Sequence, residues 1–175
     1  RSLTVADLTR RTAPGPLVLL GEHIQVSPFT HITIDNRAAA RTATEHLVAV
    51  GCRRIAYIGR RDSRPSDAAD RRHVGYVEAL TAAVGAPDSA LTAQVDAFTA
   101  DEGERATAAA LSATPDLDGI VCSNDSLALG ALAALSAAGR RVPGDVAVIG
   151  IDDIRATRFS VPALSTMAPD HEKLV

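Results

Sequence analysis

Short apolar runs alternate along this chain with longer segments in which alanine and leucine recur at helical spacing. Runs of about four to eight residues are typical of strands, and apolar residues repeated with a period of about 3.6 are typical of helices. The runs predict strands over residues 17–20, 30–35, 53–59, 91–98, 118–123 and 145–152. The segments between them predict helices over residues 37–51, 70–84, 101–113 and 125–139.

Residues at the ends of these segments support the predicted helices. Asn36 stands where it can cap the first long helix, and Gly51 and Gly139 stand where helices stop. Residues 60–70 are polar and contain Pro65, which predicts a loop.

The alternation of strands and helices determines the fold class. Strands joined by long helical crossovers form a parallel sheet with helices on both faces. The chain is therefore predicted to be an α/β protein with a Rossmann-like sheet. In such sheets, ligands bind beyond the carboxyl ends of the strands and next to helix N-termini.

Polar or aromatic side chains follow several of the predicted strands. An amide, a carboxylate and a guanidinium can share the donors and acceptors of neighbouring hydroxyl groups, and an aromatic face can cover the C–H side of a sugar. If the strands are neighbours, these side chains meet in one crevice and predict a site for a polyol. The residues that carry this hypothesis are Arg72, Phe98, Asn124 and Asp152.

Each of these residues also has a purely structural interpretation. Asn124 fits the N-cap of the helix that follows, where Asp125 complements the helix dipole. Arg72 can be a solvated helix residue, and Phe98 can belong to the core. Asp153 fits a helix cap better than a ligand contact, whereas Asp152 fits a ligand contact better.

Composition limits the possible functions. The 175 residues are 46% hydrophobic but only 3% aromatic, and the net charge is −3 with a pI of about 5.9. This balance lacks the basic excess of a nucleic-acid-binding surface. There is no stretch of about 18 apolar residues that could span a membrane.

The sequence contains no recognisable motif for catalysis or for metal binding. The chain has no G-x-S-x-G, no P-loop and no G-x-G-x-x-G after a strand, so we expect no enzyme. Cys52 and Cys122 are 70 residues apart, without zinc-site spacing, which indicates a reducing compartment. We interpret His31, His46 and His73 as structural, and we expect neither a metal nor a cofactor.

Three segments resemble one known family. They read "IDNRAAARTATEHLVAVGCRRIAYIGRR", "RRHVGYVEAL" and "DGIVCSNDSLALGALAALSAAGRRVPGDVAVIGIDDIRATRFSVPALSTM", and they cover about residues 30–167. In this order they resemble the LacI/GalR family of bacterial transcription regulators. The last segment is the most specific, because "ND" opening a helix and "VPGDVAVIGIDD" occur together.

The resemblance implies a type I periplasmic-binding-protein-like fold, in which two Rossmann-like subdomains are joined by a three-strand hinge. It implies that residues 1–29 end the N-terminal subdomain, that 30–160 form the C-terminal effector-binding subdomain, and that 161–175 return across the hinge. The helix-turn-helix of the family and most of its first subdomain have no counterpart here. We therefore expect the chain to be an incomplete fragment of a longer protein.

The resemblance also assigns roles residue by residue. Arg72, Asn124 and Asp152 match positions that contact the effector in sugar-responsive members, and Phe98 matches the aromatic residue that stacks on it. The strand in "LVLLGEHI" often presents an aspartate to the cleft, and here Glu22 is the candidate. Ser66 and Asp67 are weaker candidates, because the loop 60–70 departs from the family turn.

For the whole protein, the resemblance implies a cytoplasmic homodimer. Its dimer surface would include Leu127 and Leu129 of the helix 125–138, together with Phe159, although burial within the monomer is an alternative for the leucines. The expected partners are a sugar or related metabolite and operator DNA, the DNA bound through a headpiece outside these residues. The alternative is an exported sugar-binding protein of a transporter, with the same fold.

Overall fold

A computed structural model describes residues 5–10, 15–21, 28–61 and 68–170. The chain forms two compact units, one of residues 1–35 and 170–175 and one of residues 36–169. The first unit contains α1 (Val5–Thr9) and two parallel strands, β1 (Val18–Leu20) and β2 (Thr30–Ile32). Both strands were predicted, at somewhat greater length.

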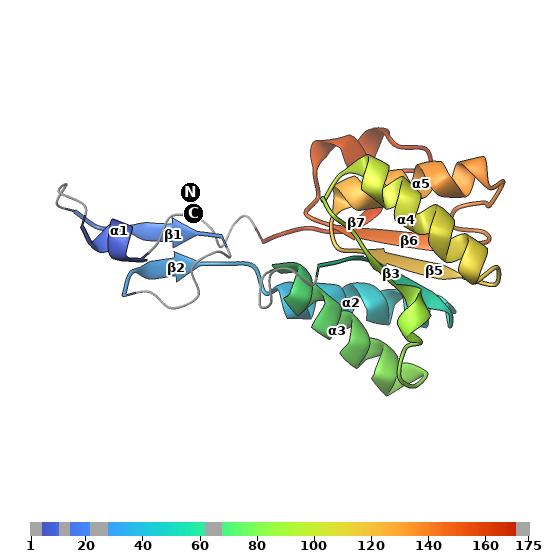
Figure 1. The fold of residues 1–175 in the computed structure, drawn as a ribbon, viewed down its shortest axis with the longest axis horizontal. Helices are drawn as coiled ribbons and strands as arrows, with labels where there is room; N and C mark the ends of the chain where they lie inside the picture. The colour runs from blue at the N-terminus through green and yellow to red at the C-terminus, as the bar shows by residue number, and fades with distance from the viewer. Residues whose placement is uncertain (1–4, 11–14, 22–27, 62–67, 171–175) are drawn as a thin grey trace. The chain divides into compact units, whose positions relative to one another are not determined.

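The second unit is built on a five-stranded parallel sheet in the order β4-β3-β5-β6-β7 (Figure 1). The strands are β3 (Ile55–Arg60), β4 (Thr92–Gln94), β5 (Gly119–Cys122), β6 (Ala147–Ile151) and β7 (Ser165–Met167). The helices are α2 (Asn36–Ala49), α3 (Ala68–Ala83), α4 (Ala100–Ala113) and α5 (Asp125–Ala137). Two 3₁₀ turns, η1 (Ser89–Leu91) and η2 (Arg155–Phe159), complete the described elements.

Helices cover both faces of this sheet, as predicted. In Figure 1, α2 and α3 lie on one side of the strands and α4 and α5 on the other. Alternate residues of β3 point to opposite faces: Tyr57 packs with Tyr76 and Leu80 of α3, whereas Ile58 packs in the cluster that includes Leu127 of α5. Both faces of the central strands are therefore buried, which confirms the α/β fold class.

Two glycines allow α4 and α5 to approach each other closely. A Cβ atom at Gly130 would lie 1.9 Å from the carbonyl oxygen of Ala100, and one at Gly103 would lie 2.1 Å from that of Leu127. Only hydrogen fits at these two positions, so the two helices contact each other backbone to backbone.

Several boundaries differ from the sequence predictions. The run 91–98 is a strand only over Thr92–Gln94, because η1 takes its first residue and the chain leaves the ladder after Val95, whose N–H donates to the Arg60 carbonyl at 3.1 Å. Asn36 lies inside α2 rather than before it.

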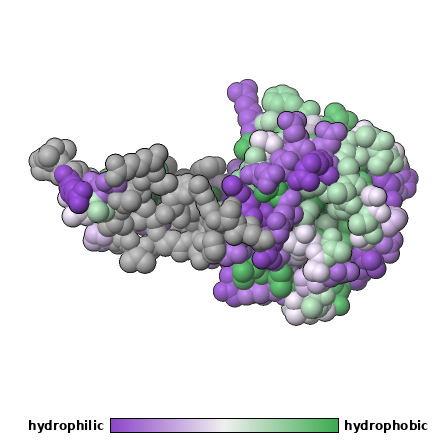
Figure 2. Space-filling view, in the orientation of Figure 1, coloured by the Kyte–Doolittle hydropathy of each residue, from purple (hydrophilic) through white to green (hydrophobic). Residues whose placement is uncertain are grey.

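The division into units also differs from the expected subdomain bounds. Residues 30–35 belong to the first unit, whereas 161–169 belong to the second, since β7 pairs with β6 along the sheet edge. None of the helices in the described part of the chain is both long and apolar enough to cross a membrane. Figure 2 shows hydrophilic and apolar side chains interspersed over the visible face of this second unit.

Candidate functional site

The carboxyl ends of β3, β5 and β6 are adjacent, because these strands are neighbours in a parallel sheet. Asn124 follows β5 after one residue, and Asp152 follows β6 directly. Arg72 lies in the second turn of α3, the helix that follows β3. The predicted juxtaposition of these three residues therefore follows from the strand order.

Arg72 is the centre of the site and is only 7% exposed. Its Nε donates to Asn36 Oδ1 at 2.6 Å, and one Nη donates to the carbonyl oxygen of Ser123. The other Nη donates to Asp152 Oδ1 at 3.0 Å in an ion pair. A guanidinium has five N–H donors, and these bonds within the described residues use three of them. The alternative of a solvated Arg72 is therefore wrong.

Asp152 is partly open to solvent, with 34% of its side chain exposed. Burial raises the pKa of Asp152 above its usual range, although the charge and hydrogen bond of Arg72 act in the opposite direction. Its backbone has φ 121°, and Asp153 has φ 52°, both in a region that residues with a Cβ rarely adopt. Such conformations gather at functional sites.

Asn124 caps α5, as its structural interpretation predicts. Its Oδ1 accepts a hydrogen bond from the N–H of Leu127 at 3.0 Å. The cap uses the carbonyl oxygen of the amide and leaves the NH₂ group without a partner among the described residues. The residue is half-buried, so capping and ligand binding are compatible.

Phe98 lies four residues beyond β4 and is half-buried against the core cluster on the α4/α5 side, as its structural interpretation predicts. The Arg61 guanidinium lies 5.3 Å from the centre of its ring. Stacking of Phe98 on a ligand stays a prediction. Glu22, Ser66 and Asp67 lie outside the described residues.

Asn36 is the site residue that sequence reasoning missed. It is 1% exposed, and its side chain accepts from Arg72 rather than serving only the helix start. The signal was present, because Asn36 is another polar residue at a strand–helix junction. Asp153 was expected to cap a helix, but the residue at the N-cap of η2 is Ile154, without a side-chain cap.

Comparisons with known proteins relate this chain to one family. Residues 44–175 match the family of periplasmic binding protein-like domains. The transcriptional regulator CelR of Thermobifida fusca is 39% identical over 140 residues, which are 79% of this chain and 40% of that protein. The regulator GalR of Escherichia coli is 37% identical over 167 residues, 93% of this chain and 47% of that protein.

The chain belongs to the LacI/GalR family of transcriptional regulators. A solved LacI-family regulator from Sanguibacter keddieii has a TM-score of 0.82 at 40% identity, covering 93% of this chain and 60% of that one. A CelR–cellobiose complex has a TM-score of 0.77 at 36% identity, covering 85% of this chain and 45% of that one. The chain spans less than half the length of these curated relatives.

The named relatives are transcriptional regulators, which supports the LacI/GalR interpretation over the exported binding protein. One expected dimer contact needs correction, however. Leu127 is fully buried in the core beneath α5 and cannot contribute to a surface. Leu129 is half-buried against the same cluster, and Phe159 is 74% exposed, so both remain available.

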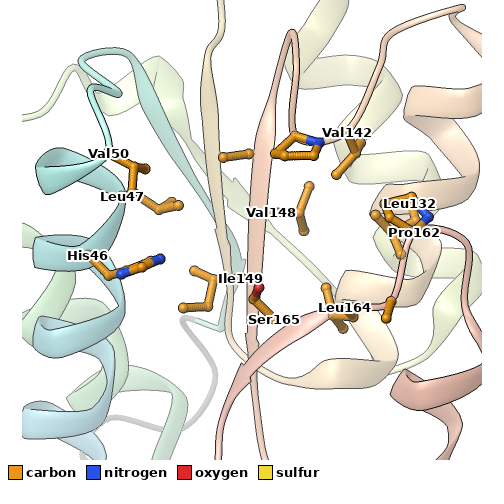
Figure 3. A pocket seen from close by; sticks show the side chains of 13 residues that line it. His46, Leu47, Val50, Leu132, Val142, Val148, Ile149, Pro162, Leu164 and Ser165 are labelled. Atoms are coloured by element: carbon orange, nitrogen blue, oxygen red, sulfur yellow. The ribbon is translucent and has the colours of Figure 1, made fainter.

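This LacI-type unit also contains an apolar pocket of about 280 Å³ at the beginning of β6 and β7 (Figure 3). Among its lining side chains only His46 and Ser165 are polar, whereas Leu47, Val148 and Leu164 are typical of the rest. The pocket lies at the opposite ends of the strands from Asp152. It offers neither a carboxylate nor a guanidinium to a hydroxylated ligand, so the cluster around Arg72 is the better candidate site.

Proposed function

We propose that this chain is the effector-binding and dimerisation region of a LacI-type regulator, with a sugar or related hydroxylated metabolite bound at the carboxyl edge of its sheet. The observation that carries this proposal is the pairing of the buried Arg72 with Asp152, which is partly open to solvent. Asn124 follows the neighbouring strand, and its NH₂ group has no partner among the described residues.

These three side chains fit two adjacent hydroxyl groups. A hydroxyl both donates and accepts, so it needs an acceptor and a donor in the site. The Asp152 carboxylate supplies charged acceptors, and Arg72 and Asn124 supply N–H donors that no described residue uses. Hydrogen bonds to charged groups are roughly twice as strong as neutral ones. Because the opposite charges of Arg72 and Asp152 already pair with each other, the site suits a neutral, hydroxyl-rich ligand.

The relatives support a carbohydrate as the ligand class. The solved CelR relative is a complex with cellobiose, and other relatives are the ribose operon repressor of Halalkalibacterium halodurans and GalR. In our proposal Phe98 covers one side of the sugar.

Binding would act on DNA through a shift of conformation. A ligand can shift an equilibrium between two arrangements of the subdomains only by its differential affinity for them. In a cytoplasmic homodimer, with Leu129 and Phe159 at the dimer surface, this shift would change how two headpieces outside these residues meet the operator half-sites. The site has a binding role in this proposal, and no reaction is assigned to it.

Calorimetry on the intact protein tests the proposal. Cellobiose, galactose and ribose are titrated into the parent and into Asp152→Ala, with the exposed Asp116→Ala as the matched control. We expect one of the sugars to bind the parent and the control equally, and binding to Asp152→Ala to be lost. DNA from the promoter of its own gene should still bind Asp152→Ala but no longer be released by sugar. Equal sugar binding by Asp152→Ala would exclude this site.

A further inference from the structure

Asp125 is a carboxylate that lies completely buried at the start of α5, with 0% of its surface exposed. Its Oδ2 accepts from the N–H of Ile154 at 2.9 Å, and its Oδ1 accepts from Thr166 Oγ1 at 2.6 Å. A buried charged or polar group is tolerated only when such bonds replace water. Asp125 therefore does more than complement the helix dipole, because it connects two segments that are 29 and 41 residues away.

Its partner Thr166 extends the connection to the turn that follows β6. The hydroxyl of Thr166 donates to Asp125 and also accepts from the N–H of Asp153 at 3.3 Å. The N–H of Asp152 donates to the carbonyl oxygen of Met167 at 3.0 Å. Three successive amides, those of residues 152 to 154, are thus bound to β7 or to Asp125.

This turn needs such support because of its backbone. Asp152 and Asp153 both have positive φ, a conformation that persists only where surrounding bonds enforce it. Space has also been kept for the Asp125 carboxylate, since a Cβ at Gly150 would lie 2.2 Å from its Oδ1. The outcome of this arrangement is that Asp152 Oδ1 lies 3.0 Å from Arg72.

We infer that Asp125 and Thr166 are positioning residues for effector binding: they hold the turn 152–154 in the conformation that presents Asp152 to the ligand. Neither residue is assigned a contact with the ligand. The inference rests on the proposed function, in which Asp152 binds the effector.

The test uses Thr166→Val, which removes the hydroxyl but keeps the shape of the side chain. Thr166→Ser retains the hydroxyl and serves as the rescue variant. Thr107→Val is the matched control, because Thr107 is buried on α4 and its hydroxyl has no hydrogen-bond partner in the described part of the chain. Two quantities are measured on the intact protein: amide hydrogen exchange at Asp153 and Ile154 without ligand, and the Kd for cellobiose, galactose and ribose.

We expect Thr166→Val to accelerate exchange of both amides and to raise the Kd of the bound sugar, each by about tenfold, as for a lost hydrogen bond to a charged group. Thr166→Ser should restore both quantities to near the parent values, and Thr107→Val should change neither. A general loss of packing would not be rescued selectively by serine, so this pattern separates positioning from stability.

The outcomes distinguish the two proposals. Unchanged exchange in Thr166→Val, or faster exchange with an unchanged Kd, overturns the positioning role. If the parent binds none of the three sugars, these are excluded as effectors, and the exchange rates alone decide whether Thr166 holds the turn. Should Thr166→Val not fold, Asp125→Asn replaces it: the amide keeps one acceptor oxygen for Ile154, so the same two quantities should change in the same direction but less. If amide exchange and the Kd of Asp125→Asn both equal those of the parent, the positioning role is overturned.

Discussion

Arg72→Met tests whether the guanidinium organises the carboxyl edge of the sheet. Methionine fills a similar apolar volume but removes the hydrogen bonds that Arg72 donates to Asn36 Oδ1 and to the Ser123 carbonyl oxygen. Both acceptors belong to residues that are at most 2% exposed. A hydrogen bond to a charged group contributes about 1.5–3 kcal/mol.

The third partner of Arg72, Asp152, contributes less to the loss of unfolding free energy. The Asp152 side chain is 34% exposed, so water can replace part of what the ion pair provided. The apolar burial of methionine offsets a further part. We therefore expect the free energy of unfolding of this unit to fall by about 2–4 kcal/mol, and sugar binding to be lost. For Arg72→Lys we expect an unfolding free energy between those of the parent and Arg72→Met. One ammonium group cannot reproduce the planar guanidinium, which reaches three partners.

Urea denaturation followed by near-ultraviolet circular dichroism is a suitable assay. The two tyrosines of the chain, Tyr57 and Tyr76, are fully buried and pack on the α3 face, so their signal reports this unit. The control is Arg41→Met, whose parent side chain is 59% exposed in a surface pair and should leave the curve unchanged. If Arg72→Met unfolds at the same urea concentration as the parent, the assignment of Arg72 as the buried centre of the site is refuted.

Three further predictions concern stability. Glu102 accepts from Arg105 and from the N–H of Asp96, which lowers its pKa from 4.5 to about 2, so it stabilises the fold above the unfolded pKa and this contribution is lost as the pH falls toward 2. Denaturation curves of the parent and Glu102→Gln should therefore converge between about pH 5 and pH 2, and a constant difference would contradict this. Thr107→Val should leave the unfolding free energy unchanged or raise it by about 1 kcal/mol, since it removes a buried hydroxyl without a partner among the described residues, and a clear loss in urea denaturation would disprove this. Gly130→Ala should lower the free energy of unfolding by about 1–3 kcal/mol, because the new Cβ would meet the Ala100 carbonyl. This is opposite to the usual helix preference for alanine over glycine, and a rise in the thermal midpoint would speak against the close helix contact.

The sequence predicted most elements and the junctions that carry the site, because the period of apolar residues and the residues at segment ends are local properties. Strand order is not local, and the sequence analysis used it only as a condition. The sequence also did not reveal which leucine of α5 is fully buried. That helix is apolar on most of its circumference, so its pattern cannot separate the face toward the sheet, where Leu127 lies, from a face toward a partner.

Partners that are distant in sequence were also hidden. Asn36 and Asp125 each looked like helix-terminus residues, and their local context gave no sign of Arg72 or Thr166. Their roles depend on contacts across 36 and 41 residues, which only the assembled sheet brings together. The pairing of β4 is likewise a property of the sheet, since its register with β3 shifts between Ile58 and Arg60.

The glycine contacts between α4 and α5 have a mechanical consequence. Helices that touch through side chains can slide by small changes of rotamer, which is how shear motions proceed. At Gly103 and Gly130 main chain meets main chain, so no rotamer is available to absorb a displacement. We therefore expect α4 and α5 to keep their relative position under load, so that any displacement within this unit occurs between other elements.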